Sequence, residues 1–349
     1  MWCDRHFVSQ ARSIVSTFDA TLPVQTIAAG KFRRYYHLSF WQHITWPSLV
    51  FQNIGDAFLV AAGFVQSLVK LILWRPDVVF TKGGYVCLPV GMAARLLRIP
   101  LVIHDSDAHP GLTNRVLSRW ADAIGTGAPL EYYAYPKDRS AYVGIPIKDQ
   151  FRPFTTTEQI AAKEEWGIAA TRPLVVVTGG GLGAQRLNDV IIASLEEIQK
   201  HAAVVLVAGA GQYDSLRILF PEDTADFQLY PFINNMDRLL GAADVVVARA
   251  GATTILELAA LEKPTILVPN GKLTGGHQLK NAAVYADARA AIILDENDLE
   301  HDKDLIVRSI RELIDNPKTA KAMALRFATF ARPNAAKDMA AMILAARRK

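Results

Sequence analysis

Glu257 is the residue whose setting in this chain points most directly to chemistry. It follows a β-branched run, Val245-Val246-Val247, typical of a buried parallel strand, and a small-residue turn, Ala250-Gly251-Ala252, that opens a helix-like stretch. Backbone N–H groups at such a helix start bind phosphate, and a carboxylate about one and a half turns further on can accept hydrogen bonds from both hydroxyls of a ribose. The alternative is a capping box, in which Thr254 is the N-cap and Glu257 bonds back to it. The residues alone leave both interpretations open.

Strand-like and helix-like stretches alternate along the chain, as a site of this kind requires. Each apolar run is followed by a turn and a helical pattern, an order typical of parallel sheets with helices on both faces. The runs are Val78-Val79-Phe80, Leu101-Val102-Ile103, Leu174-Val175-Val176-Val177, Val204-Val205-Leu206-Val207, Val245-Val246-Val247 and Thr265-Ile266-Leu267-Val268.

The segment 148–172 interrupts this alternation and marks a domain boundary, which agrees with a length of 349 residues, more than one core usually serves. We expect two Rossmann-like domains, 1–150 and 151–333, with parallel sheets that face a central cleft. Ligands would lie at the carboxyl ends of the strands. The last stretch, 334–349, is expected to be a helix that joins the first domain.

Composition narrows the class of protein. Hydrophobic residues make up 51% of the chain and charged residues 21%, so it is neither disordered nor fibrous. The net charge of +4 is too small to indicate nucleic acid as a partner. The two cysteines, Cys3 and Cys87, match neither a metal-ligand spacing nor a disulfide framework, which favours a reducing compartment. We therefore expect a cytoplasmic protein.

Two neighbouring segments of the first domain have compositions relevant to membrane binding. Segment 31–51 mixes basic residues with aromatic rings, a combination that can hold a protein at an anionic lipid surface, although the rings can equally be core. Segment 58–74 is apolar, but it is short for a membrane span and is broken by Gln66 and Lys70. We expect a packed helix of an α/β unit there.

Three further turns could carry ligand contacts. Gly179 to Gly183 follows the first strand of the second domain, and Lys82-Gly83-Gly84-Tyr85 follows a strand of the first; backbone without Cβ atoms lets a diphosphate or sugar approach closely. His104-Asp105-Ser106-Asp107 ends another strand and is rich in titratable groups. Successive loop residues diverge in space, whereas metal ligands must converge, so we expect no metal there.

Taken together, these motifs resemble the MurG family of glycosyltransferases from about residue 75 to the C-terminus. The resemblance implies a GT-B fold and transfer of N-acetylglucosamine from UDP-N-acetylglucosamine to undecaprenyl-diphospho-N-acetylmuramoyl-pentapeptide, at the cytoplasmic face of the plasma membrane. The matching motifs are Lys82-Gly83-Gly84-Tyr85, His104-Asp105-Ser106-Asp107, Gly111-Leu112-Thr113-Asn114, Gly144-Ile145-Pro146-Ile147-Lys148, Gly179-Gly180-Gly181-Leu182-Gly183-Ala184, Phe232-Ile233-Asn234-Asn235-Met236, Arg249-Ala250-Gly251-Ala252 and His277-Gln278-Leu279-Lys280-Asn281-Ala282.

The resemblance also assigns roles to single residues. It implies main-chain contacts from Ile233 to uracil, backbone contacts from Ala252 and Thr253 to the diphosphate, and a Glu257 carboxylate on the ribose hydroxyls, so ribose binding is favoured over the capping box. The full set of expected substrate-binding residues is Asp107, Lys148, Gly181, Ile233, Ala252, Thr253, Thr254, Ile255, Leu256, Glu257, His277 and Gln278.

Four of these positions depart from the family pattern. Lys148 replaces an arginine and loses its bidentate fork, Asp107 replaces an asparagine, Gly181 replaces a serine, and His277 replaces the first of two glutamines that hold the sugar. Nucleotide binding is expected to survive these changes, whereas the sugar bound is less certain to be that of the family.

A larger departure concerns the catalytic base. The family opens with a Gly-Gly-x-Gly-Gly-His loop that this sequence lacks, so we expect the true start to lie upstream of Met1 and the base with it. Among the residues present, His104 is the candidate by motif position, although a structural histidine is the favoured interpretation. The alternatives are a GT-B transferase with another UDP-sugar or lipid acceptor, and an inactive UDP-sugar-binding paralogue. No cofactor or metal is expected.

Overall fold

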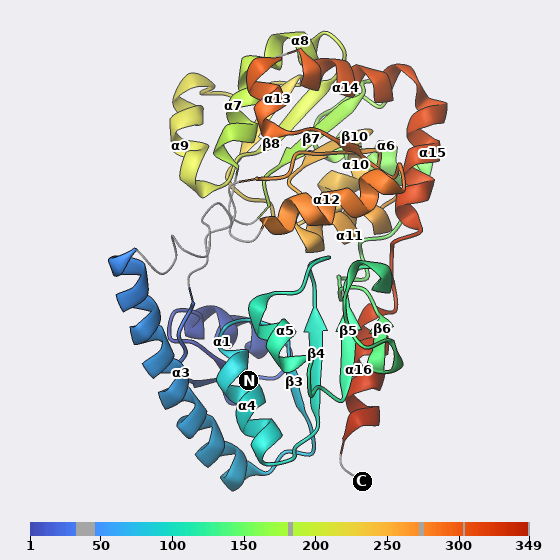
Figure 1. The fold of residues 1–349 in the computed structure, drawn as a ribbon. Helices are drawn as coiled ribbons and strands as arrows, with labels where there is room; N and C mark the ends of the chain where they lie inside the picture. Colours follow the sequence, from blue (N-terminus) through green and yellow to red (C-terminus); the bar gives the residue numbers. More distant parts are fainter. Residues whose placement is uncertain (33–45, 181–183, 272–275, 303, 348–349) are drawn as a thin grey trace. The chain divides into compact units, whose positions relative to one another are not determined.

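The computed structural model describes residues 1–32, 46–180, 184–271, 276–302 and 304–347 (Figure 1). It divides into an N-terminal unit, Met1–Val143 with Lys337–Lys349, and a C-terminal unit, Gly144–Ala336. Each unit is built from parallel strands joined by helices. The expected α/β class is confirmed.

The N-terminal unit holds two parallel sheets. One is two-stranded, β1 (Trp2–Cys3) beside β2 (Gln25–Thr26), and the other has the order β3 (Val79–Thr81), β4 (Leu101–Asp105), β5 (Ala123–Thr126) and β6 (Ser140–Tyr142). The helices are α1 (Val8–Ser16), α3 (Pro47–Trp74), α4 (Cys87–Leu96), α5 (Leu112–Leu117) and α16 (Ala335–Ala346), with 3-10 turns η1 (Leu130–Tyr132) and η2 (Lys137–Arg139).

The C-terminal unit has one six-stranded parallel sheet of order β12-β11-β10-β7-β8-β9. Its strands are β7 (Leu174–Thr178), β8 (Ala203–Val207), β9 (Phe227–Tyr230), β10 (Val245–Ala248), β11 (Thr265–Leu267) and β12 (Ile292–Ile293). Its helices are α6 (Thr156–Glu165), α7 (Gln185–Ala193), α8 (Leu195–Gln199), α9 (Ala210–Leu219), α10 (Met236–Ala242), α11 (Ala252–Ala260), α12 (His277–Asp287), α13 (Glu296–His301), α14 (Leu305–Asp315) and α15 (Pro317–Ala328).

The strand order of the C-terminal unit fixes where a ligand can bind. β7 is first along the chain and lies in the middle of the sheet, with the later strands added on one side and then on the other. The direction of winding therefore reverses between β7 and β10, which pair from Val245 opposite Val175 to Ala248 opposite Thr178. Ligands of such sheets bind outside the carboxyl ends of the strands at this switch point.

Valine explains why β7 and β10 form the centre of that sheet. β-branched side chains suit a pleated surface that is covered on both faces, and every residue of both strands is buried. Val175 and Val177 face a core shared with α7 and α14, to which Leu187 and Ile310 contribute. This rigid centre supports the turns that follow both strands.

Helix α3 differs from the packed helix expected for 58–74. It is 28 residues long, and it is long and apolar enough to cross a membrane by length and composition. Only a narrow stripe is buried, and most of its apolar side chains, such as Phe58 at 73% exposure, face outwards. The predicted helix packs against α4 on one side, but most of its apolar surface is exposed, because hydropathy does not show how much of a helix is covered by the rest of the fold.

Candidate functional site

The turn after β10 opens α11 as the sequence suggested, but without a side-chain cap. Gly251 is the N-cap, and no side chain bonds to the helix start. Thr254 is therefore the third residue of the helix, which excludes the capping box with Glu257. The first bond into the helix runs from the Ile255 N–H to the Gly251 carbonyl at 3.0 Å, so the N–H groups of 252–254 lead the helix and face outwards.

A hollow of about 500 Å³ opens at this edge of the sheet. It is lined from the ends of β7 and β8, from the segment between β9 and α10, and from α11, so that distant parts of the sequence meet at the switch point. The lining residues are Lys148, Gln150, Phe151, Thr178, Gly180, Val207, Gly209, Ala210, Pro231, Phe232, Ile233, Asn234, Met236, Asp237, Leu240, Thr254 and Glu257.

Burial in this hollow changes the pKa of the Glu257 side chain. Loss of water around its carboxylate raises its pKa to about 7, against which the charge of Lys148 acts in the opposite direction. Among the residues that the structure describes, none donates a hydrogen bond to this carboxylate. A half-buried acceptor without a donor is suited to ligand hydroxyls, which would restore the bonds that burial removes.

A buried ion pair fixes the turn beside this carboxylate. Arg249, 5% exposed, pairs with Glu296, and its Nη1 donates to the Val268 carbonyl at 2.9 Å. Glu296 also pairs with Arg186 at 2.9 Å. These contacts hold the chain rigid just before the N-terminus of α11. Sequence reasoning missed them; the signal was an arginine at the end of an otherwise apolar strand, which a buried site must pair.

Helix α12 holds the other end of the same turn. The Asn281 side-chain amide donates to the Ala250 carbonyl at 3.2 Å. His277 and Gln278 lie in the first turn of α12, and Gln278 accepts a hydrogen bond from the Asn270 N–H at 2.8 Å. Neither residue lines the hollow. Their expected contact with the sugar stays a prediction.

The remaining residues of the expected set line the hollow, form the first turn of α11, are buried in α11, or lie outside the described residues. Ile233, 8% exposed, and Thr254 line the hollow, and Ala252 and Thr253 form the first turn of α11. Ile255 and Leu256 are 0% and 2% exposed, so we assign them to the packing of α11 and not to ligand contact. Gly181 lies outside the described residues; Gly180, just before it, has φ +73, which only glycine adopts without strain.

In the N-terminal unit, the strand end 104–107 is buried and internally bonded. The His104 side chain is 0% exposed, which gives its ring a structural role and no route to an acceptor hydroxyl. Burial raises the pKa of Asp105 to about 6, and the Tyr135 hydroxyl donates to this carboxylate at 2.7 Å. Asp107 is half-buried, and its carbonyl accepts from the Tyr133 hydroxyl at 2.6 Å.

Two other motifs of that unit lie against this strand end. Gly83 has φ +87, and a Cβ there would lie 2.5 Å from the Asn114 amide. The same amide donates to the His104 carbonyl at 3.0 Å. Tyr85, two residues after Gly83, bonds to the Asp4 carboxylate after β1. The motifs that are separate in sequence thus form one cluster, with Asp4 and Tyr135 as members that sequence reasoning missed.

Two family models match the chain: the glycosyltransferase family 28 N-terminal domain over residues 10–126, and the glycosyltransferase family 28 C-terminal domain over residues 174–339. A protein of Bacillus cytotoxicus is 31% identical over 92% of this chain and 84% of its own length, and one of Bacillus licheniformis is 32% identical over 83% and 79%. Both are named UDP-N-acetylglucosamine--N-acetylmuramyl-(pentapeptide) pyrophosphoryl-undecaprenol N-acetylglucosamine transferase.

Solved structures share the fold. MurG of Acinetobacter baumannii has a TM-score of 0.72 at 23% identity, covering 99% of this chain and 90% of its own. A calicheamicin glycosyltransferase has a TM-score of 0.64 at 13% identity, with the same two coverages. The predicted GT-B class is confirmed by these likenesses.

Proposed function

This chain belongs to the MurG family of glycosyltransferases, and we propose that it moves N-acetylglucosamine from UDP-N-acetylglucosamine to undecaprenyl-diphospho-N-acetylmuramoyl-pentapeptide in peptidoglycan synthesis. The observation that carries the proposal is the carboxylate of Glu257, half-buried in a hollow of about 500 Å³ beside the start of α11. Ribose hydroxyls would donate to that carboxylate, and the diphosphate would lie at the helix N-terminus.

The proposed reaction is a direct displacement with inversion. The acceptor hydroxyl attacks the anomeric carbon and gives its proton to a general base, the bond from that carbon to the diphosphate oxygen breaks, and UDP leaves with the electron pair. The positive end of the α11 dipole and the N–H groups of 252–254 stabilise the charge that gathers on the diphosphate. Lys148, whose charge already acts on Glu257, adds a cation at the same edge of the hollow.

A donor competition assay tests this proposal. We expect turnover of UDP-N-acetylglucosamine with a lipid-linked muramoyl-pentapeptide acceptor, and a preference over UDP-glucose and UDP-galactose when all are present. A wide preference for either of the last two would contradict the sugar, and activity with a diacylglycerol acceptor would contradict the acceptor. UDP binding without turnover of any donor would favour a UDP-sugar-binding protein without activity.

Helix α3 supports a second part of the proposal, attachment to the cytoplasmic face of the plasma membrane. Its outward side carries Phe51, Ile54, Phe58, Val65 and Val69, which are 74%, 49%, 73%, 58% and 51% exposed. Residues at this spacing share one helix face, and an apolar face of that length fits the boundary between lipid headgroups and acyl chains.

The opposite side of α3 supports a helix that lies on the membrane instead of crossing it. The Gln66 side chain accepts from the Ala28 N–H at 2.9 Å, and the Lys70 ammonium donates to Gln25 at 2.8 Å. A Cβ at Gly63 would lie 1.8 Å from the Ala28 carbonyl, so the helix touches the backbone beside β2. The two polar residues that interrupt the apolar run are therefore bonded to the rest of the N-terminal unit.

Cosedimentation with anionic vesicles tests the attachment. We expect Phe51→Gln combined with Phe58→Gln to release the protein from phosphatidylglycerol vesicles, whereas Phe18→Gln, which removes an 85% exposed ring elsewhere in the unit, should not. Arg33, Arg34 and Trp41, in the basic part of segment 31–51, lie outside the described residues. Replacing them together should weaken binding most at low salt, where surface charge is least screened. Equal sedimentation of all variants would contradict the proposed surface.

A further inference from the structure

Helices α10 and α11 both point their N-terminal ends at the hollow of about 500 Å³ in which we propose that the nucleotide binds, here called the nucleotide hollow. Met236 and Asp237 at the start of α10, and Thr254 and Glu257 in α11, line it. Both helices then run back to the amino edge of the same sheet, where β10 and β11 begin. Their C-terminal ends therefore lie together on the side of the unit away from the hollow.

Lys263 joins the two helices at that side. Its backbone N–H donates to the Leu258 carbonyl of α11 at 3.2 Å. Its ammonium donates to the carbonyls of Gly241 and Ala243, at the end of α10, at 2.7 and 2.9 Å. Carbonyls at a helix end have no intrahelical donor, and a cation there also meets the negative end of the dipole. The side chain, 6% exposed, is thus held by α10.

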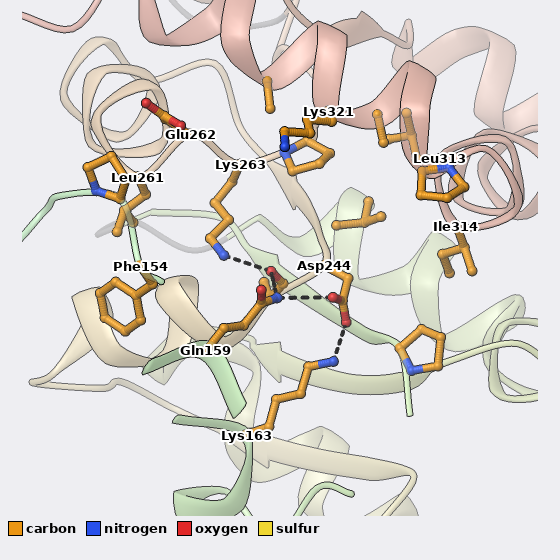
Figure 2. Close-up of a pocket in the computed structure, with 18 of the residues that line it drawn as sticks. Phe154, Gln159, Lys163, Asp244, Leu261, Glu262, Lys263, Leu313, Ile314 and Lys321 are labelled. Atoms are coloured by element: carbon orange, nitrogen blue, oxygen red, sulfur yellow. Dashed lines mark hydrogen bonds and ion pairs between the residues drawn. The ribbon is translucent and has the colours of Figure 1, made fainter. Parts of the chain in front are cut away.

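Charged side chains surround the Lys263 ammonium, which is itself buried. Figure 2 shows Lys263 in a second hollow of about 460 Å³, with Lys163 on α6, Asp244 before β10, Glu262 beside it and Lys321 on α15. Asp244 pairs with Lys163 at 2.6 Å, and its charge also acts on the Lys263 ammonium. Burial lowers the pKa of Lys263 to about 8; Lys163 acts in the same direction and Asp244 in the opposite one.

We propose that Lys263 is a positioning residue for nucleotide-sugar binding, because it fixes the spacing of α10 and α11 and thereby the shape of the nucleotide hollow. The inference rests on the proposed function of that hollow. α10 has seven residues and is about 10 Å long, so a shift at its C-terminal end is passed to Met236 and Asp237 by a single rigid helix.

Paired substitutions test the tether. Lys263→Met removes the ammonium and keeps most of the apolar stem, whereas Lys321→Met removes an exposed cation from the same hollow without touching α10. In Lys263→Met we expect the KM for UDP-N-acetylglucosamine to rise about fivefold or more and kcat to change less than twofold. A fivefold change is the lower end of the range for coupling between two separate sites. Lys263→Arg should restore most of the affinity, and Lys321→Met should behave as the original protein.

The dependence of the KM on pH gives a second test, because a residue with a purely structural role would leave this dependence unchanged. As the pH rises from 8 to 9.5, above the titration of Glu257, the ammonium loses its remaining proton, so the KM should rise, whereas in Lys263→Arg the KM should stay flat over the same range. An unchanged KM in folded Lys263→Met, or profiles that coincide, would overturn the inference alone. No binding of UDP-N-acetylglucosamine by the original protein would overturn the proposed function, and this inference with it.

Discussion

The two hollows of the C-terminal unit lie at opposite edges of one sheet and are nearly equal in volume, about 500 and 460 Å³. They differ in what their polar groups bond to. At the carboxyl edge, the Glu257 carboxylate has no donor among the described residues, and the leading N–H groups of α11 face outwards. At the amino edge, Lys163, Asp244 and Lys263 are bonded to one another or to backbone carbonyls (Figure 2).

The difference teaches that volume alone does not identify a binding site. Burying a charged group without a hydrogen-bond partner costs free energy, and a ligand that supplies the partner recovers that cost. Where the protein supplies every partner itself, the same kind of hollow stabilises the fold. Apart from Lys263, which acts on the carboxyl edge through α10, changes at the amino edge should therefore act mainly on stability, and changes at the carboxyl edge mainly on ligand affinity.

The largest effect should come from the amino edge. Asp244→Ala removes the counter-charge of Lys163, whose side chain is 6% exposed, and we expect a loss of about 2–3 kcal/mol in the free energy of unfolding, below the full cost of a broken buried pair because Asp244 is 34% exposed. Urea unfolding measures it. Asp226→Ala, which breaks a more exposed pair with Arg172, is the matched control and should cost less than about 1 kcal/mol. Equal losses would show that burial of the Lys163–Asp244 pair does not make it more important for stability than a surface pair.

At the carboxyl edge, Glu257→Ala should weaken UDP binding by about 1.5–3 kcal/mol, the usual worth of hydrogen bonds to a charged group. Calorimetric titration with UDP measures the loss, and thermal unfolding checks that the variant folds. Because the substitution removes a carboxylate whose burial is unfavourable, the protein without ligand should not lose stability. Unchanged UDP affinity in the folded variant would show that ligand hydroxyls do not use this carboxylate.

The same contrast separates what the sequence predicted from what it did not. The valine runs and the turns after them predicted the central strands and the start of α11, because these features depend on neighbouring residues. Lys263 was missed because a lysine before a strand usually lies on the surface, and its burial depends on Gly241, which is distant in sequence. The Arg249–Glu296 pair was missed for the same reason.

The outward face of α3 shows another limit of prediction from sequence, in which the type of element is predicted but the extent of its burial is not. Hydropathy predicted an apolar helix correctly, but the extent of burial depends on how much partner surface the fold provides. In this unit the partner surface is provided by α4 and by a strip beside β2 that α3 reaches through Gly63, Gln66 and Lys70, and it covers only one side of the helix.

A smaller effect should follow from pH. The pKa of Glu257 is raised to about 7 in the protein without ligand, and ribose hydroxyls donate best to the ionised form, so the contribution of Glu257 to affinity should be nearly full at pH 8 and fall as the pH drops through 7. The ionised fraction drops about tenfold between pH 8 and 6, which sets the expected change in Kd for UDP-N-acetylglucosamine. This ligand is preferred to UDP because its diphosphate does not titrate there. Glu257→Gln is the control and should lack this loss of affinity below pH 8.

The smallest effect should come from His277→Gln, outside both hollows. The residue lies in the first turn of α12, and glutamine has one donor and one acceptor group to offer, as neutral histidine does. We expect the KM for UDP-N-acetylglucosamine to stay within about twofold, as for most substitutions away from a core, and the preference over UDP-glucose to rise and not fall. Donor competition measures both. Gln278→Ala is the comparison, because it removes the contact with the Asn270 N–H and should cost more. A KM that rises more than about tenfold in His277→Gln would show that the imidazole itself holds the ligand, and that the ligand reaches beyond the hollow at the carboxyl edge.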